Sequence, residues 1–130
     1  MPEYRLDKQT GLPFFHCHLV NQHEVSLAVN GLVDTSRRES SISYRIFSAL
    51  GFETLIPGNK DEKQQYLGAS CTGWLTFDIH GEQTSRFKHE FRIQELPDTH
   101  DVVVGMDFIR AHFELKILPS TGVFVLSPLK

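Results

Sequence analysis

The sequence predicts a single, mostly β domain: a barrel or sandwich that carries two short helices. Segments that alternate apolar and polar residues, or that are continuously apolar, recur at intervals of about ten residues with turn residues between them. Two short segments have the spacing of a helix. The length of 130 residues is that of one domain, and no repeat indicates a solenoid.

The first half of the chain predicts two strands, a helix and a third strand. Residues 14–22 (FFHCHLVNQ) and 24–36 (EVSLAVNGLVDTS) are typical of strands, because the second alternates and then ends in an apolar run. Residues 43–51 (SYRIFSALG) predict a short helix that begins at a serine and stops at a glycine. Residues 52–70 predict a strand and then a polar excursion.

The second half predicts further strands around one more helix. Residues 72–81 alternate well, and residues 81–96 continue as a turn and a second strand. Residues 101–113 (DVVVGMDFIRAHF) predict an apolar strand, a glycine and a short helix. Residues 114–129 predict a closing hairpin around PSTG.

The composition indicates a soluble globular protein and excludes several classes of function. We expect residues 1–13 to form an N-terminal arm and residues 14–130 to form the domain. A net charge of −3 gives no reason to expect binding to nucleic acid or to an anionic membrane. No apolar stretch approaches the roughly 18 residues that span a bilayer, and the polar start lacks a signal-peptide core. We therefore expect an intracellular, cytoplasmic protein.

The cysteines, histidines and serines predict no metal site, disulfide or serine nucleophile. Cys17 and Cys71 are too few for a disulfide framework and are expected to be buried free thiols. His16 and His18 could share a strand face, but no further ligand follows at a recognisable spacing. The stretch SRRESSIS lacks the Gly-x-Ser-x-Gly pattern of hydrolases. No metal and no organic cofactor is expected.

The stretch LVDTSRRESSIS (residues 32–43) places Asp34 at the end of an apolar strand. Asp34, Thr35 and Ser36 alone are a weak signal, because Asp and Ser are common in turns. Their context is stronger, since a serine-rich turn and a helix follow them. Further along, DVVVGMDFIRAHF repeats this order with an apolar strand, Gly105 and a second helix.

Together, these segments resemble the two motifs of the retropepsins, the single-domain aspartic proteases of retroviruses, retrotransposons and related cellular proteins. The first family motif is an apolar pair, Asp-Thr-Gly-Ala and a serine-containing segment ending in Ile-Ser. The second is an apolar trio, glycine, any residue, aspartate and Phe or Leu, and VVVGMDFIRAH is similar to it. The resemblance covers roughly residues 15–127, and the first motif is matched at Asp34, Thr35, Ser40, Ile42 and Ser43.

The resemblance implies an all-β acid-protease fold, a retropepsin-like closed barrel with one or two short helices. It also implies a homodimer in which each chain contributes Asp34 to a catalytic dyad. Two carboxylates about 3 Å apart cannot both ionise, so they share one proton. The ionised one activates a water and the protonated one polarises the scissile carbonyl. The implied activity is that of an aspartic endopeptidase acting on an extended peptide or polyprotein.

Further residues receive roles from the resemblance. Thr35 would hydrogen-bond across the dimer axis. A flap over the cleft would come from residues 56–73, where Gly58 and Gly68 permit movement. The second motif would be structural, through Gly105, Asp107 and Arg110. Asp107 begins the last helix, where a carboxylate favourably meets the helix dipole, and Asp107 or Arg110 is expected to partner Arg37, Arg38 or Glu39.

The chain departs from the family motif directly after Thr35. Ser36 stands where the family has glycine, and Arg37 stands where it usually has alanine, beside a substrate pocket. Arg37 and Arg38 are therefore candidates for a substrate-pocket or regulatory role. Two cations close to each Asp34 favour ionised carboxylates, and ionising both would remove the shared proton. This leaves a second function open: a catalytically inactive retropepsin-like module for dimerisation or peptide binding.

Overall fold

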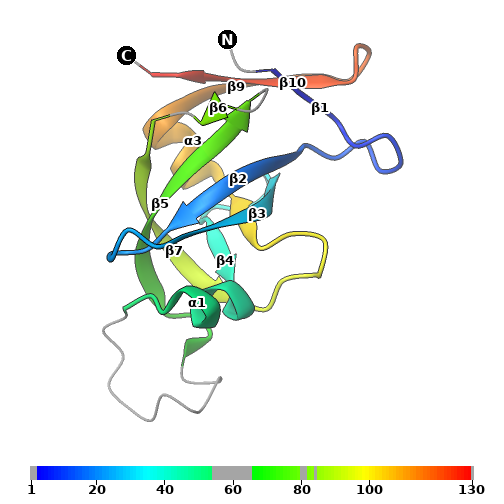
Figure 1. Ribbon diagram of the computed structural model, residues 1–130. Helices are drawn as coiled ribbons and strands as arrows, with labels where there is room; N and C mark the ends of the chain where they lie inside the picture. Colours follow the sequence, from blue (N-terminus) through cyan, green and yellow to red (C-terminus); the bar gives the residue numbers. More distant parts are fainter. Residues whose placement is uncertain (1–2, 54–65, 80–81, 84, 130) are drawn as a thin grey trace.

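The computed structural model describes residues 3–53, 66–79, 82–83 and 85–129, and it consists mainly of strands (Figure 1). The strands are β1 (Glu3–Arg5), β2 (Phe14–Val20), β3 (Ser26–Val33), β4 (Ser41–Ser43), β5 (Ser70–Ile79), β6 (Glu82–Gln83), β7 (Phe87–Gln94), β8 (Val102–Val104), β9 (Phe113–Leu118) and β10 (Val123–Pro128). The helices are α1 (Tyr44–Leu50) and α3 (Met106–His112). For the described residues, the prediction of a mostly β domain with two short helices is confirmed.

Six of the strands close into a barrel. Their order is β2-β3-β8-β4-β7-β5, and β5 pairs back to β2, which removes the open edge of the sheet. β3 pairs with β8 in parallel, β4 pairs with β7 in parallel, and the other barrel pairings are antiparallel. The predicted closed barrel is therefore present.

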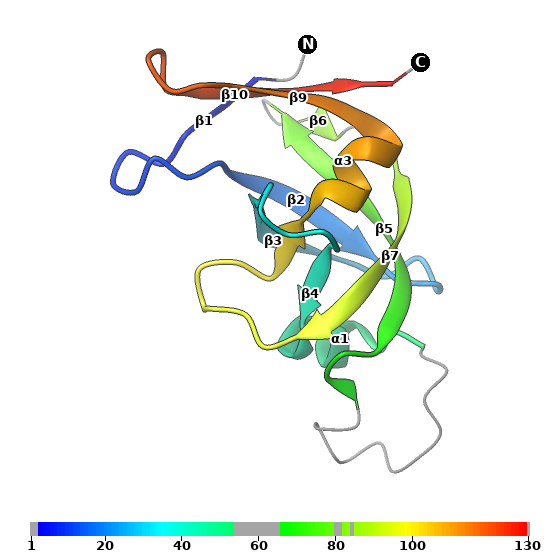
Figure 2. The same ribbon diagram turned by 180° about the vertical axis from the view of Figure 1, so that it is seen from behind.

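A three-stranded antiparallel sheet, β1-β10-β9, covers one end of the barrel, and α1 lies at the opposite end (Figures 1 and 2). β9 and β10 form the predicted closing hairpin. Part of the expected arm, residues 3–5, supplies the strand at the edge of this sheet.

Aromatic rings fill the space between the barrel and the three-stranded sheet. The ring of Phe77 is buried, with its centroid 4.9 Å from that of Phe15 and 5.3 Å from that of Phe113. Tyr4 of β1 stacks on Phe124 at 5.0 Å. Burying large rings removes much apolar surface from water, about 1.5–3 kcal/mol for each fully buried side chain, so this packing ties the two sheets together.

Helix α1 begins and ends as its sequence predicts. The Ser43 hydroxyl accepts a hydrogen bond from the Ile46 amide at 3.2 Å and so caps the first turn. Gly51 ends the helix in the left-handed region, with φ of 65°, which glycine adopts without steric cost. The buried face carries Ile46, Phe47 and Leu50.

The two motifs meet because β3 and β8 run parallel. Leu32 lies opposite Val103, and Val33 lies opposite Val104. Residues 102–104 are fully buried, as is usual for a strand covered on both faces. Since parallel strands end at the same edge of a sheet, the residues that follow β3 and β8 are brought side by side.

Candidate active site

Asp34 lies just beyond β3, at the start of the segment that we call the Asp34 loop (residues 34–40). Its amide donates a hydrogen bond to the Val104 carbonyl at 3.0 Å, which continues the β3–β8 pairing by one step. The carboxylate is partly exposed, with 31% of the side chain accessible. The fold therefore presents one partly exposed aspartate directly after β3, at the strand end where the sequence places it.

The Asp34 carboxylate is held by its own loop. Oδ1 accepts hydrogen bonds from the Ser36 amide at 3.0 Å and from the Ser36 hydroxyl at 2.5 Å. Oδ2 lies 3.5 Å from Arg37 Nε. Bonds of this kind from an aspartate to a residue two positions on define a tight turn, so the loop orients the carboxylate before any partner arrives.

Ser36 fits the position where the family has glycine. Among the described residues, Glu24 is the only non-glycine with a positive φ. Ser36 therefore does not use a backbone conformation that only glycine adopts readily. Ser36 and Thr35 are both exposed. The Ser36 hydroxyl donates a hydrogen bond to Asp34, which glycine cannot do because it has no side chain.

Arg37 lies across the loop rather than out in solvent. Its Nη1 donates to Gln94 Oε1 at 2.8 Å, and the same oxygen accepts the Ser41 hydroxyl at 3.0 Å. The guanidinium therefore bridges Asp34 and the end of β7. Arg38 is exposed on the same loop.

Gly105 is required where the second motif meets the Asp34 loop. An added Cβ would lie 2.7 Å from the Glu39 carbonyl oxygen and 3.0 Å from that of Arg37, both of them backbone atoms. Its amide donates to the buried Ser40 hydroxyl at 2.8 Å. Glycine at this position lets the loop pass directly over the start of α3.

The first backbone amides of α3 donate hydrogen bonds to the Asp34 loop. Met106 N donates to the Arg37 carbonyl at 2.9 Å, and Asp107 N donates to the Arg38 carbonyl at 3.0 Å. The first amides of a helix have no partner within it, and here the loop carbonyls accept from two of them. The backbone positions of both arginines are therefore set by α3.

The Asp107 carboxylate contacts Ser40 and His89, and not the charged side chains of the loop. Its Oδ1 accepts from the Ser40 hydroxyl at 2.6 Å and from the Phe108 amide at 2.6 Å, while Oδ2 lies 3.0 Å from His89 Nε2. Burial alone would raise the pKa of Asp107, but the hydrogen bond from Ser40 and the nearby His89 outweigh it, and the pKa lies below its usual value. The exposed Arg110 has no hydrogen bond or ion pair with the described residues.

Side chains from β7, which lies outside both motifs, also belong to the site. Glu39 Oε2 pairs with Arg92 Nε at 2.5 Å, so the charged partner of Glu39 comes from β7. Gln94 and His89 come from the same strand. The alternating sequence of β7 indicates a strand, but nothing local in it indicates the Asp34 loop as its neighbour.

The structure describes only part of the predicted flap. Gly58 lies outside the described residues. Gly68 has a φ of 88°, and its amide donates to the Ile93 carbonyl at 2.7 Å. Its carbonyl accepts from Arg92 Nη1 at 2.8 Å, so this residue is anchored to β7.

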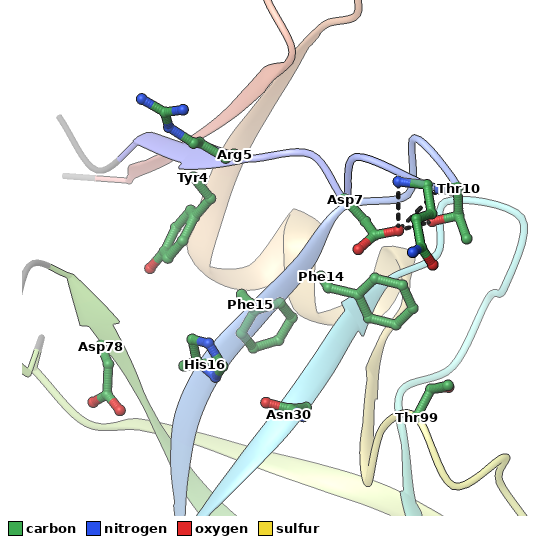
Figure 3. A pocket seen from close by; sticks show the side chains of 11 residues that line it. Tyr4, Arg5, Asp7, Thr10, Phe14, Phe15, His16, Asn30, Asp78 and Thr99 are labelled. Carbon is green, nitrogen blue, oxygen red and sulfur yellow. Dashed lines mark hydrogen bonds between the residues drawn. The ribbon is translucent and has the colours of Figure 1, made fainter.

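A cavity of about 600 Å³ lies away from Asp34, between the N-terminal segment and the barrel (Figure 3). Tyr4, Phe15, His16 and Asp78 are among its lining residues. Burial, reinforced by Cys17 and Asp78, raises the pKa of the Tyr4 hydroxyl, which therefore stays protonated. Asp78 is engaged with His18 Nδ1 at 3.0 Å. Asp7 also lines the cavity and accepts from the Thr10 amide at 2.9 Å and the Thr10 hydroxyl at 2.8 Å, but it lies between β1 and β2 and not at the end of a barrel strand.

Three sequence expectations concern groups elsewhere in the chain. Cys17 and Cys71 are buried free thiols, as predicted. Within residues 3–53, 66–79, 82–83 and 85–129, no cluster of His, Cys, Asp or Glu is placed to hold a metal ion. No helix in this part of the chain has the length and apolar character needed to cross a membrane.

Solved structures share the fold of this barrel. No protein-family model matches the chain, and no curated protein matches it. It is similar to the retroviral protease-like domain of Ddi1 from Leishmania major, with 16% identity, a TM-score of 0.55, and coverage of 92% of this chain and 94% of that one.

A second similar structure is a retropepsin-like aspartic protease from Rickettsia conorii. The identity is 14% and the TM-score 0.56, with 95% of this chain and 89% of that chain covered. Likeness at this level of identity concerns the fold. The chain therefore has the retropepsin-like fold that its two motifs resemble.

Proposed function

We propose that this protein is an aspartic endopeptidase that works as a homodimer, with Asp34 of each chain forming the catalytic dyad. The observation that carries the proposal is the position of Asp34 on a loop braced by the second motif, within a retropepsin-like barrel. A chain with one such loop holds one half of a dyad, and a second copy of the chain supplies the other.

The chemistry follows from two carboxylates that face each other. Held close together they share a single proton, because two adjacent charges of the same sign repel. The ionised Asp34 takes a proton from a bound water, which attacks the peptide carbonyl, and the protonated Asp34 of the other chain polarises the carbonyl oxygen. Thr35 holds the two loops together across the axis.

The substrate is an extended peptide or a segment of a polyprotein. An extended peptide adds to a sheet edge through main-chain hydrogen bonds, while pockets for its side chains set specificity. The stretch that contains Gly58 and Gly68 acts as the flap over this peptide. Gly105 and Asp107 belong to the structural support of the loop, in which Asp107 fixes Ser40.

One observation supports the alternative of an inactive dimerisation or peptide-binding module. Arg37 Nε lies 3.5 Å from Asp34 Oδ2, where it competes with a water or a substrate group for the same oxygen. The contact is long and partly exposed, and such pairs contribute about 0–1 kcal/mol. A substrate that contributes more than this displaces the arginine.

The test is cleavage of a peptide library at mildly acidic and at neutral pH, with sedimentation to establish the dimer. Wild type is expected to cleave and Asp34→Asn to lose cleavage while remaining dimeric. Asp98→Asn is the matched control, because Asp98 is a fully exposed aspartate outside the loop. A dimeric wild type without cleavage supports the inactive module, and cleavage by Asp34→Asn overturns the role of Asp34.

A further inference from the structure

Beside Asp34 lies a cavity of about 530 Å³ with a cationic lining. Three arginines and one glutamate face it, so the charged side chains sum to +2, although the whole chain has a net charge of −3. The remaining lining residues are polar or glycine. The full lining is Arg37, Arg38, Glu39, Ser41, Gly68, Arg92 and Gln94.

Arg92 is fixed in this cavity by two contacts. Nε pairs with Glu39 Oε2 at 2.5 Å, and Nη1 donates to the Gly68 carbonyl at 2.8 Å. A guanidinium has five N–H donors, and within the described residues Nη2 has no partner. The Glu39 charge is neutralised by Arg92 itself, which leaves Arg38 and Arg37 as the other cations of the cavity, with Arg37 3.5 Å from the Asp34 carboxylate.

Arg37 is fixed in a similar way and connects the cavity to Asp34. Its Nε faces Asp34 and its Nη1 donates to Gln94, which leaves Nη2 without a partner in the described part of the chain. The backbone of Arg38 is held by α3 through its carbonyl, while its side chain is exposed. Three guanidinium groups therefore converge on one hollow, and the loop and β7 hold two of them in place.

We propose that this cavity is a specificity site for an acidic side chain, Asp or Glu, of the peptide substrate. The proposal rests on the proposed endopeptidase function. Arginine binds carboxylates through paired N–H donors, which gives strong charge-assisted hydrogen bonds. An apolar side chain would instead bury the arginine heads without a partner, which is costly.

The position of the carboxylate in the peptide follows from the geometry. Arg37 lines the cavity and also lies 3.5 Å from the Asp34 carboxylate. An extended peptide advances about 3.3 Å per residue, so a carboxylate in the cavity belongs to a residue within about two positions of the scissile bond. The acidic residue therefore accompanies the cleaved bond closely and is not a remote docking motif.

Binding can be measured without cleavage by using the Asp34→Asn protein. Fluorescent peptides that are identical except for Glu or Gln at one position are titrated by polarisation at low and high salt. We expect the Glu peptide to bind about tenfold or more tightly at low salt, the factor for one charge-assisted hydrogen bond, and the difference to shrink at high salt. Arg38→Gln, in the same background, is expected to reduce the Glu preference without affecting the fold.

Arg92→Gln provides a second variant with a matched control. Arg92 and Arg86 each pair with a glutamate and are similarly exposed, at 44% and 47%, but only Arg92 lines the cavity. Arg92→Gln is expected to remove the Glu preference, and Arg86→Gln to leave it intact. Equal affinity for the Glu and Gln peptides, or no binding of either, overturns the proposal.

The two proposals fail in different ways. If the Glu peptide binds selectively and wild type cleaves no peptide, the acidic site stands and the protease function fails. If wild type cleaves peptides without regard to acidic residues, the protease function stands and the acidic site fails.

Discussion

A methyl group at Gly105 would collide with the backbone of the Asp34 loop, so Gly105→Ala tests whether the two motifs hold each other in place. The new Cβ would lie 2.7 Å from the Glu39 carbonyl oxygen and 2.8 Å from the Glu39 carbonyl carbon. These are main-chain atoms, which cannot rotate away as the end of a side chain can. The loop must therefore move away from α3 by about 0.7 Å to restore an ordinary contact of about 3.4 Å.

The expected cost follows from two opposing effects. Overfilling a packed site costs about 1–3 kcal/mol. Alanine also lowers the conformational entropy of the unfolded chain, which stabilises the folded protein by about 0.4–1 kcal/mol. This gain applies here because alanine readily adopts the φ of −95° found at Gly105. The net loss in the free energy of unfolding is about 1–2 kcal/mol, or roughly 3 to 8 °C in Tm for a domain of this size.

The assay is urea denaturation of Gly105→Ala beside Gly73→Ala. Gly73 also has a close contact, at 3.0 Å, but with a side-chain atom of Phe52, and its nearest backbone atom, the Val20 carbonyl oxygen, is 3.4 Å away. We expect Gly73→Ala to lose less stability and Gly105→Ala also to lose peptide cleavage, because the displaced loop carries Asp34. If Gly105→Ala is as stable and as active as wild type, the bracing of the loop by α3 is refuted.

Two further predictions concern the groups around α3. Ser40→Ala leaves the buried Gly105 amide without its acceptor and should cost about 1–3 kcal/mol in urea denaturation, whereas Ser36→Ala, at an exposed hydroxyl, should cost much less; equal costs would contradict the role given to Ser40. Burial, together with the nearby His89, lowers the pKa of His112, so the unfolded chain takes up a proton more readily and stability should fall as the pH drops below about 6.5. His112→Phe keeps a ring at this site and should reduce that pH dependence; an unchanged pH profile would show that His112 is not its source.

The positions of Asp34 and Gly105 at strand ends could be predicted from the sequence because they depend on local patterns. The run before Asp34 and the three valines before Gly105 are apolar enough to be buried strands. Each is followed by a turn and a helix signal. These patterns place Asp34 and Gly105 at strand ends, and the parallel pairing of β3 with β8 brings the ends together.

The partners from β7 could not be predicted in this way. Ser41 lies opposite Arg92, and Ser43 lies opposite Gln94, only because β4 and β7 pair in parallel. That pairing joins segments more than fifty residues apart and depends on how the whole barrel closes. An alternating strand specifies which side chains share a face, but not which loop that face meets.

The two departures from the family motif have different physical consequences. Replacing the family's glycine with Ser36 could strain the backbone, but the φ of Ser36 is not in the region reserved for glycine. The serine therefore adds a hydrogen bond to Asp34 without strain. Replacing the family's usual alanine with Arg37 adds a positive charge, and Gln94 holds this guanidinium beside the Asp34 carboxylate. In the proposed dyad, two such loops bring two cations to two carboxylates, so the proposed catalysis requires a substrate group that draws Arg37 away. The acidic side chain proposed for the adjacent cavity is a group of this kind, and under the two proposals together Arg37 links specificity to chemistry.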